Sequence, residues 1–130
     1  MNTNSHIVAN EIRKKILSTA YNSKARGCHL GGALSCVDFI SVLISDYSLN
    51  NEIDPKSMRI TLSKGHACLS IYCTMNYIGK ISDCELSKFE ENGSYLAGHP
   101  IANEDQGIYF STGSLGIGMS NAVGQAIYLK

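Results

Sequence analysis

The amino-acid sequence predicts an α/β fold, in which helices flank a parallel sheet. Segments with a helical spacing of apolar residues alternate with short β-branched segments, and this alternation is typical of parallel sheets. The chain has 130 residues, 44% hydrophobic and 17% charged, which is the composition of one globular domain. Because two strands are too few for such a sheet, we expect residues 1–130 to form a single partial domain.

The first half of the chain contains two predicted helices and one predicted strand. Apolar residues at helical spacing predict an amphipathic helix over residues 5–24. A capping box that begins at Ser35 predicts a second helix to about Tyr47, and its apolar residues leave little polar face, so it should be buried nearly all round. A turn is expected over residues 50–56, followed by a β-branched strand over residues 59–63.

The second half of the chain contains three predicted helices and another strand. Helical spacing predicts a third helix over residues 66–77. A second capping box begins at Ser82 and predicts a short helix that ends before Asn92. Residues 108–112 are predicted as a strand, which leads through a glycine-rich turn into a final helix from Ser114 onward.

Charge and cysteine usage exclude several classes of partner. The 11 basic and 11 acidic side chains cancel, and the one basic cluster is short, so we expect neither a nucleic-acid nor a membrane partner. The sequence has no secretory pattern at its start and no apolar run long enough to span a bilayer. Its five cysteines are odd in number and lack paired spacing, which predicts reduced thiols and a cytoplasmic location.

Three of the four histidines lie close to glycines or at the end of a predicted helix or strand, namely His29, His66 and His99. Ligands of open α/β sheets bind at the carboxyl ends of strands, and helix N-termini attract anions. Each histidine alone is compatible with an ordinary loop residue, whereas the three together indicate a ligand site. Cys28 and Cys68 lie beside two of them and would complete a zinc site, but without paired spacing this alternative is weak, and we assign no metal ligand.

Residues 112–118 form a predicted strand-to-helix turn with three glycines. Their order differs from that of the dinucleotide fingerprint, and the turn lacks the lysine of a phosphate loop. Two interpretations remain open, a backbone surface against a flat or phosphorylated ligand, or close helix packing through Gly116, Ser120 and Gly124. Spacing alone slightly favours packing.

Four motifs occur in order along the chain, His-Leu-Gly-Gly-Ala-Leu-Ser at 29–35, Leu-Ser-Lys-Gly-His-Ala at 62–67, Gly-His-Pro at 98–100 and Ser-Thr-Gly-Ser-Leu-Gly at 111–116. Together they resemble the N-terminal, diphosphate-binding part of transketolase, a thiamine diphosphate enzyme. The resemblance covers nearly the whole chain. It is strongest to the split transketolases, whose N-terminal and C-terminal halves are separate chains.

The resemblance implies the N-terminal part of a thiamine diphosphate-binding fold, incomplete in this chain, and the transfer of a two-carbon ketol unit between sugar phosphates. In the family, the histidine that matches His66 reaches the cofactor diphosphate. Those that match His29 and His99 line the substrate channel and handle hydroxyl protons, so we expect both to be catalytic. The turn that approaches the cofactor matches Gly113, Ser114, Leu115 and Gly116.

The same resemblance implies cofactors and partners. We expect thiamine diphosphate and Mg²⁺, with the metal ligands outside this chain, because the family's Gly-Asp-Gly segment has no counterpart before Lys130. The expected partners are sugar-phosphate substrates, a further copy of this chain and a C-terminal pyrimidine-binding subunit. Cys28 departs from the glycine that is usual in the family. We expect little or no activity from this chain alone.

Two other interpretations remain. A truncated, inactive remnant or interaction module would also end in an apolar helix at Lys130. An enzyme like 1-deoxyxylulose 5-phosphate synthase shares the cofactor and a similar element around His29, but the Ser-Lys-Gly-His segment at 63–66 favours transketolase.

Overall fold

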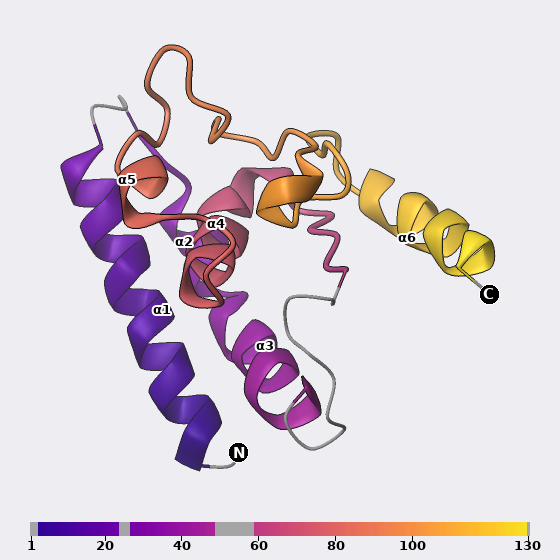
Figure 1. Ribbon diagram of the computed structural model, residues 1–130, viewed down its shortest axis with the longest axis horizontal. Coiled ribbons are helices and arrows are strands. Elements are labelled where there is room, and N and C mark those ends of the chain that lie inside the picture. Colours follow the sequence, from indigo (N-terminus) through magenta and orange to yellow (C-terminus); the bar gives the residue numbers. More distant parts are fainter. Residues whose placement is uncertain (1–2, 24–26, 49–58, 130) are drawn as a thin grey trace.

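The computed structural model describes residues 3–23, 27–48 and 59–129 (Figure 1). The turn expected over 50–56 lies outside these residues. The elements of the described part are helical, and their bounds in chain order are α1 Thr3–Asn22, α2 Leu30–Leu34, α3 Val37–Val42, a π-helical segment Leu43–Ser48, a 3₁₀ turn Gly65–Ala67, α4 Cys68–Tyr77, α5 Asp83–Leu86, a 3₁₀ turn Glu104–Gln106 and α6 Ile117–Tyr128.

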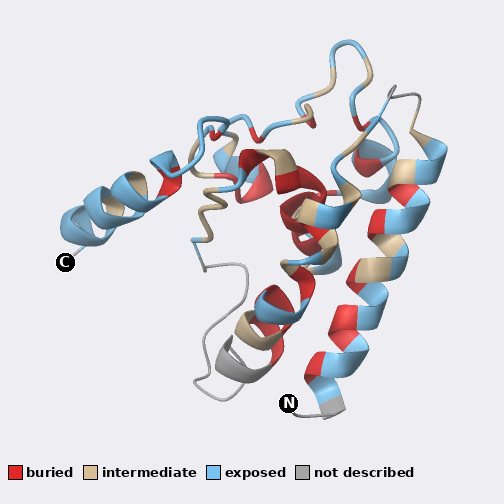
Figure 2. Ribbon diagram, turned by 180° about the vertical axis from the view of Figure 1, so that it is seen from behind, coloured by how far each residue is buried: buried red, intermediate tan, exposed pale blue. Residues whose placement is uncertain are grey.

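The hydrophobic core lies between α1, α3 and α4 (Figure 2). Val8, Ile12 and Ile16 recur at helical spacing on the buried side of α1, as the sequence pattern predicts. Helix α4 is buried from Cys68 to Met75, so it runs through the centre of the molecule. Both helix predictions are confirmed within two residues at each end.

The helix predicted from Ser35 differs from the structure at its start. The Ser35 hydroxyl donates to the carbonyl oxygen of Gly32 (2.8 Å), and α3 begins only at Val37 with no side-chain cap. The capping-box prediction is therefore wrong, because Ser35 ends the unpredicted helix α2 and satisfies a carbonyl of that helix. The expected burial on all sides is also wrong, since Phe39 is 69% exposed.

Neither predicted strand forms in the described chain. Segments 59–63 and 108–112 contribute to no sheet ladder, and pairing is limited to an isolated antiparallel bridge between Asn103 and Ile108. The parallel sheet is thus not confirmed. β-branched residues favour strands where a neighbouring strand and a packed face exist, rather than through an intrinsic backbone preference. Segment 59–63 instead has an irregular backbone, and the side chains of Ile60 and Leu62 pack against the core.

The capping box at Ser82 is confirmed. The Ser82 hydroxyl accepts the backbone N–H of Glu85 (3.2 Å), and a Glu85 carboxylate oxygen accepts the backbone N–H of Ser82 (2.8 Å). The resulting helix α5 is shorter than predicted, because it ends at Leu86 and continues as turns.

Ser82→Ala is expected to lower the free energy of unfolding by about 1 kcal/mol, since it removes the cap of α5. Hydrogen bonds from the Ser82 hydroxyl and backbone N–H lower the pKa of Glu85. The charged carboxylate therefore stabilises the folded state at neutral pH, and this stabilisation is lost as the pH falls through the lowered pKa. The difference between the variant and the parent should therefore shrink in acid. Urea unfolding at several pH values measures both effects, with Ser18→Ala on exposed α1 surface as the control. A difference that does not depend on pH would contradict the assigned role of Glu85.

Helix α6 extends away from the rest of the molecule (Figure 1). It begins at Ile117, after Gly116 at φ +91°, rather than at Ser114 as predicted. The helix approaches the rest of the described chain closely at Gly118, where an added Cβ would lie 2.7 Å from the Ser63 Cα. Gly116, Ser120 and Gly124 are exposed, so the packing that their spacing favours does not form among the described residues. None of the described helices combines the length and apolarity needed to cross a bilayer.

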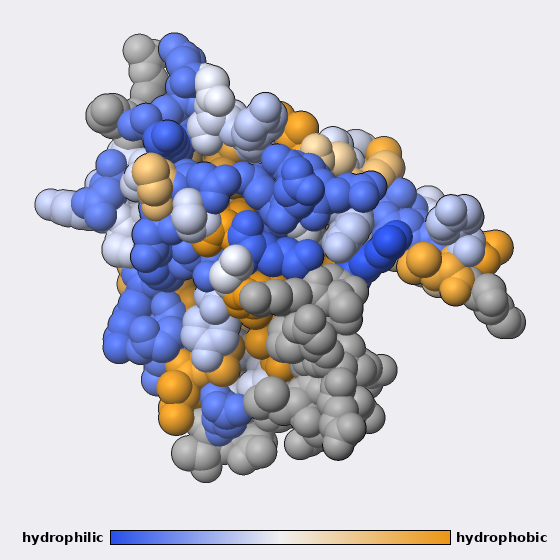
Figure 3. Space-filling model, viewed as in Figure 1, coloured by the Kyte–Doolittle hydropathy of each residue, from blue (hydrophilic) through white to orange (hydrophobic). Residues whose placement is uncertain are grey.

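Large apolar side chains are exposed on and around α6 (Figure 3). They are Leu115, Ile117, Met119, Val123, Ile127, Tyr128 and Leu129.

Candidate functional site

The three histidines that the sequence indicates, His29, His66 and His99, line one pocket of about 100 Å³. His29 comes from the residue before α2, His66 from the 3₁₀ turn before α4, and His99 from the loop after α5. The His29 and His66 rings meet edge to face with centroids 5.4 Å apart. The remaining pocket residues are Gly27, Cys28, Cys68, Leu69, Phe89, Glu90 and Gly98.

Helix α2 positions two of these histidines. The His29 carbonyl accepts the backbone N–H of Ala33 (3.1 Å), which places His29 at the N-terminus of the helix. Gly32, one turn later, faces the His66 ring, since an added Cβ would lie 3.0 Å from its Cδ2 and 3.1 Å from its Nε2. Glycine at this position therefore allows the α2 backbone to approach the imidazole closely.

Two hydrogen bonds hold the loop that carries His99. On one side, the buried Tyr72 of α4 donates its hydroxyl to the carbonyl oxygen of Ala97 (2.8 Å). On the other side, the backbone N–H of Thr112 donates to the carbonyl oxygen of Pro100 (3.1 Å). The His99 loop is thus tied both to the core and to the glycine-rich turn.

The glycine-rich turn reaches this site only at its first residues. An added Cβ on Gly113 would lie 3.9 Å from the His99 Cδ2, and one on Gly65 would lie 2.8 Å from the Thr112 carbonyl oxygen. The start of the turn therefore packs directly against the segment that carries His66. Of the other three residues predicted to bind the cofactor, Ser114 and Gly116 are exposed and Leu115 is 72% exposed, and none lines the pocket.

Sequence reasoning missed Glu90, which lines the same pocket. Its backbone is left-handed (φ 57°), which is uncommon for a residue other than glycine, and its N–H donates to the Leu96 carbonyl oxygen (2.8 Å). The Glu90 carboxylate lies against Gly98, where it leaves no room for a Cβ. No motif marks Glu90, because the sequence around it shows only the end of a helix.

The two cysteines in the pocket are protonated thiols at neutral pH. Burial, reinforced by the Glu90 carboxylate, raises the pKa of Cys68 to about 12, and the same causes raise the pKa of Cys28. Neutral thiols are weak nucleophiles. The described residues contain no group of three or more His, Cys, Asp or Glu side chains arranged to hold a metal.

The donor set suits an anionic or hydroxyl-rich ligand. Imidazoles can bind anions and exchange protons near neutral pH, and the backbone at the start of the turn lies beside them. The Thr112 hydroxyl oxygen, outside the lining of the pocket, is buried without a hydrogen-bond partner in the described chain. A pocket of about 100 Å³ admits only one end of a cofactor-sized ligand.

Comparison with known proteins identifies the family. The family model for the thiamine diphosphate binding domain of transketolase matches residues 4–130. The chain is 37% identical over 121 residues to one subunit of the apulose-4-phosphate transketolase of Phocaeicola vulgatus, and the match covers 91% of this chain and 42% of that protein. It is 36% identical over 126 residues to the subunit of the same name from Actinobacillus succinogenes, with 94% and 45% covered.

Transketolase 2 of Escherichia coli is 36% identical over 124 residues, which are 92% of this chain and 18% of that enzyme. The chain therefore spans less than half the length of these relatives. The family match extends over almost every residue of the chain, including all four motifs and the three histidines of the pocket. With a match of this extent, the chain belongs to the transketolase family, as part of its thiamine diphosphate binding domain.

Proposed function

We propose that this chain contributes the diphosphate-binding part of a thiamine diphosphate-dependent transketolase that transfers a two-carbon ketol unit between sugar phosphates. The observation that carries the proposal is the convergence of His29, His66 and His99 on one pocket beside the glycine-rich turn. Family membership supports the cofactor, and the polar groups of the pocket suit the anionic and hydroxylated parts of such ligands.

His66 is the proposed ligand of the cofactor diphosphate, together with the turn formed by Gly113, Ser114, Leu115 and Gly116. The close approach of Gly65 to Thr112 keeps His66 next to the start of this turn. Bound thiamine diphosphate supplies the electron sink that stabilises a carbanion. Mg²⁺ would neutralise the diphosphate, with ligands outside this chain.

His29 and His99 are the proposed catalytic residues, which hold and move protons at substrate hydroxyl groups. Both line the pocket and are exposed, so a sugar can reach them, and the hydrogen bonds from Tyr72 and Thr112 restrain the loop of His99. Positioned imidazoles suit this role because they exchange protons near neutral pH.

We propose that a further copy of this chain, together with a second chain that binds the pyrimidine, completes the site. The pocket is too small to enclose a whole cofactor, and two relatives are named as single subunits of a transketolase. The chain alone would then lack ketol-transfer activity. We also propose a cytoplasmic location, which the five free cysteines support.

His66→Ala is expected to weaken thiamine diphosphate binding at least about tenfold in the complex with Mg²⁺ and the pyrimidine-binding chain, because it removes a charge-assisted hydrogen bond. Calorimetric titration of the complex with the cofactor measures the effect. His6→Ala is the matched control, since His6 is exposed on α1 and outside the pocket. Equal affinity of the two variants would contradict the role proposed for His66.

A further inference from the structure

Glu90 lines the histidine pocket, and the proposed function gives it no role. It is the last residue of the turns that follow α5. Its carboxylate lies against Gly98, the residue before His99, where it leaves no room for a Cβ. The carboxylate is therefore next to the loop that carries one of the two proposed catalytic histidines.

The negative charge of Glu90 acts on the inside of this pocket. Burial is the main cause that raises the pKa of the Cys28 and Cys68 thiols, and the Glu90 carboxylate raises both further. The described residues that line the pocket include neither lysine nor arginine. Among them the polar side chains are thus three imidazoles, two uncharged thiols and one carboxylate.

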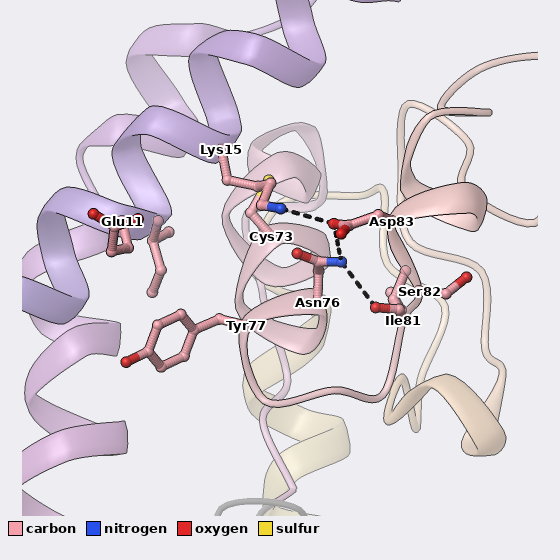
Figure 4. Close-up of a pocket in the computed structure, with 9 residues that line it drawn as sticks. Glu11, Lys15, Cys73, Asn76, Tyr77, Ile81, Ser82 and Asp83 are labelled. Atoms are coloured by element: carbon pink, nitrogen blue, oxygen red, sulfur yellow. Dashed lines mark hydrogen bonds and ion pairs between the residues drawn. The ribbon is translucent and has the colours of Figure 1, made fainter.

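The Glu90 carboxylate is free to accept hydrogen bonds from a ligand. Within the described residues it takes part in no ion pair. A larger pocket, between α1, α4 and the segment that leads into α5, shows the contrasting case (Figure 4). There, one Asp83 carboxylate oxygen lies 2.7 Å from the Lys15 ammonium and accepts from the Asn76 amide nitrogen (3.1 Å).

The backbone of Glu90 is unfavourable for glutamate. Its φ of 57° lies in the left-handed region, where a residue with a Cβ is strained and glycine is not. Three residues later the same loop has glycine at such a position, since Gly93 has a φ of 84°. Strained residues of this kind concentrate at ligand sites. Glycine would suit the Glu90 backbone better, and what glutamate adds is its carboxylate in the pocket.

Such a carboxylate favours an uncharged hydroxyl group over an anion. A hydroxyl donates a hydrogen bond to it, and hydrogen bonds to charged groups are stronger than those between neutral groups. An anionic group meets a like charge, which the described lining offsets with no lysine or arginine. Sugar phosphates carry both kinds of group, so Glu90 would determine which end of the sugar enters.

We propose that Glu90 is a specificity-determining residue, an inference that rests on the proposed transketolase function. Its carboxylate accepts a hydrogen bond from a hydroxyl at the unphosphorylated end of the sugar and keeps anionic groups away from Gly98 and His99. The cofactor diphosphate lies on the other side, where His66 meets the turn that begins at Gly113.

Two ketol donors test this role in the complex with thiamine diphosphate, Mg²⁺ and the pyrimidine-binding chain, with ribose 5-phosphate as the acceptor. Both transfer the same two-carbon unit. L-Erythrulose carries hydroxyl groups beside this unit and releases glycolaldehyde. Hydroxypyruvate carries a carboxylate there, takes up one proton and releases carbon dioxide. The ratio of their kcat/KM values therefore reports how well the site tolerates an anion.

Glu90→Gln keeps an acceptor and removes the charge. It is expected to raise the kcat/KM of hydroxypyruvate relative to that of L-erythrulose about three- to tenfold. Added salt should raise this ratio in the parent, because it screens the charge, and should leave it unchanged in the variant. Glu104→Gln is the control, since this exposed carboxylate lies outside the pocket, and its ratio should equal that of the parent.

Glu90→Gly also removes the acceptor, in a residue that suits the left-handed backbone. The KM of L-erythrulose is expected to rise about tenfold or more. The variant should unfold at a urea concentration no lower than the parent does, because the strain is relieved. A residue that served folding alone would show the reverse, a less stable variant with the parent's KM.

The proposal would be overturned by an unchanged donor ratio in Glu90→Gln, or by an unchanged KM or a lower stability in Glu90→Gly. Each of these outcomes leaves the proposed function intact, because the parent complex still transfers the ketol unit. If the parent complex transfers it from neither donor, the proposed function fails, and the role of Glu90 fails with it.

Discussion

Tyr72→Ala is expected to lower the free energy of unfolding by about 3–5 kcal/mol, because it leaves a ring-sized cavity in the core. Tyr72 is fully buried in α4, and its ring meets that of Phe89 edge to face with centroids 6.1 Å apart. A loss of this size is a large part of the stability of a single domain. Urea unfolding followed by circular dichroism measures it.

Tyr72→Phe separates packing from hydrogen bonding. Burial raises the pKa of the Tyr72 hydroxyl, which therefore remains a donor to the Ala97 carbonyl oxygen at neutral pH. The Phe variant keeps the ring and should lose about 1 kcal/mol. Since this bond holds the loop of His99, the His99 ring signals should also shift in NMR spectra. Equal losses in the Ala and Phe variants would show that the ring packing contributes nothing.

Helices α1 and α4 and the capping box of α5 could be predicted because their signals are local. The apolar spacing of α1 and the Ser82–Glu85 pair each lie within the element that they specify. The strands could not be predicted in this way. The β-branched residues of segment 59–63 favour a strand locally. A strand also needs a hydrogen-bonded neighbouring strand, which depends on residues far away in sequence.

The same distinction applies to the site. The three histidines could be found because each lies close to glycines or at the end of a predicted helix or strand, and the structure brings them into one pocket. Helix α2 could not be predicted, since two of its five residues are glycines with poor helix propensity. Glu90 could not be predicted either, because its left-handed backbone is held by a hydrogen bond to Leu96, across the turn that follows it.

Gly65→Ala is expected to lower the free energy of unfolding by about 1–3 kcal/mol through overpacking. An added Cβ would lie 2.8 Å from the Thr112 carbonyl oxygen and 3.0 Å from the Gly113 Cα. These neighbours are backbone atoms, which cannot rotate away as a side chain would, so the two segments must separate. Gly31→Ala is the matched control, because nothing lies within 4 Å of its added Cβ and alanine favours the helix.

The separation caused by Gly65→Ala should also reach the site, because it moves His66 away from the turn that begins at Gly113. Cofactor affinity in the assembled complex is therefore expected to fall about tenfold or more, measured by calorimetry at a temperature where the variant is folded. The Gly31→Ala complex should bind as the parent does. If Gly65→Ala destabilises the chain but leaves cofactor affinity unchanged, the close approach of these two segments serves folding alone, and the turn is not part of the diphosphate site. A loss of affinity in the folded variant instead requires that His66 and the turn act on the same ligand.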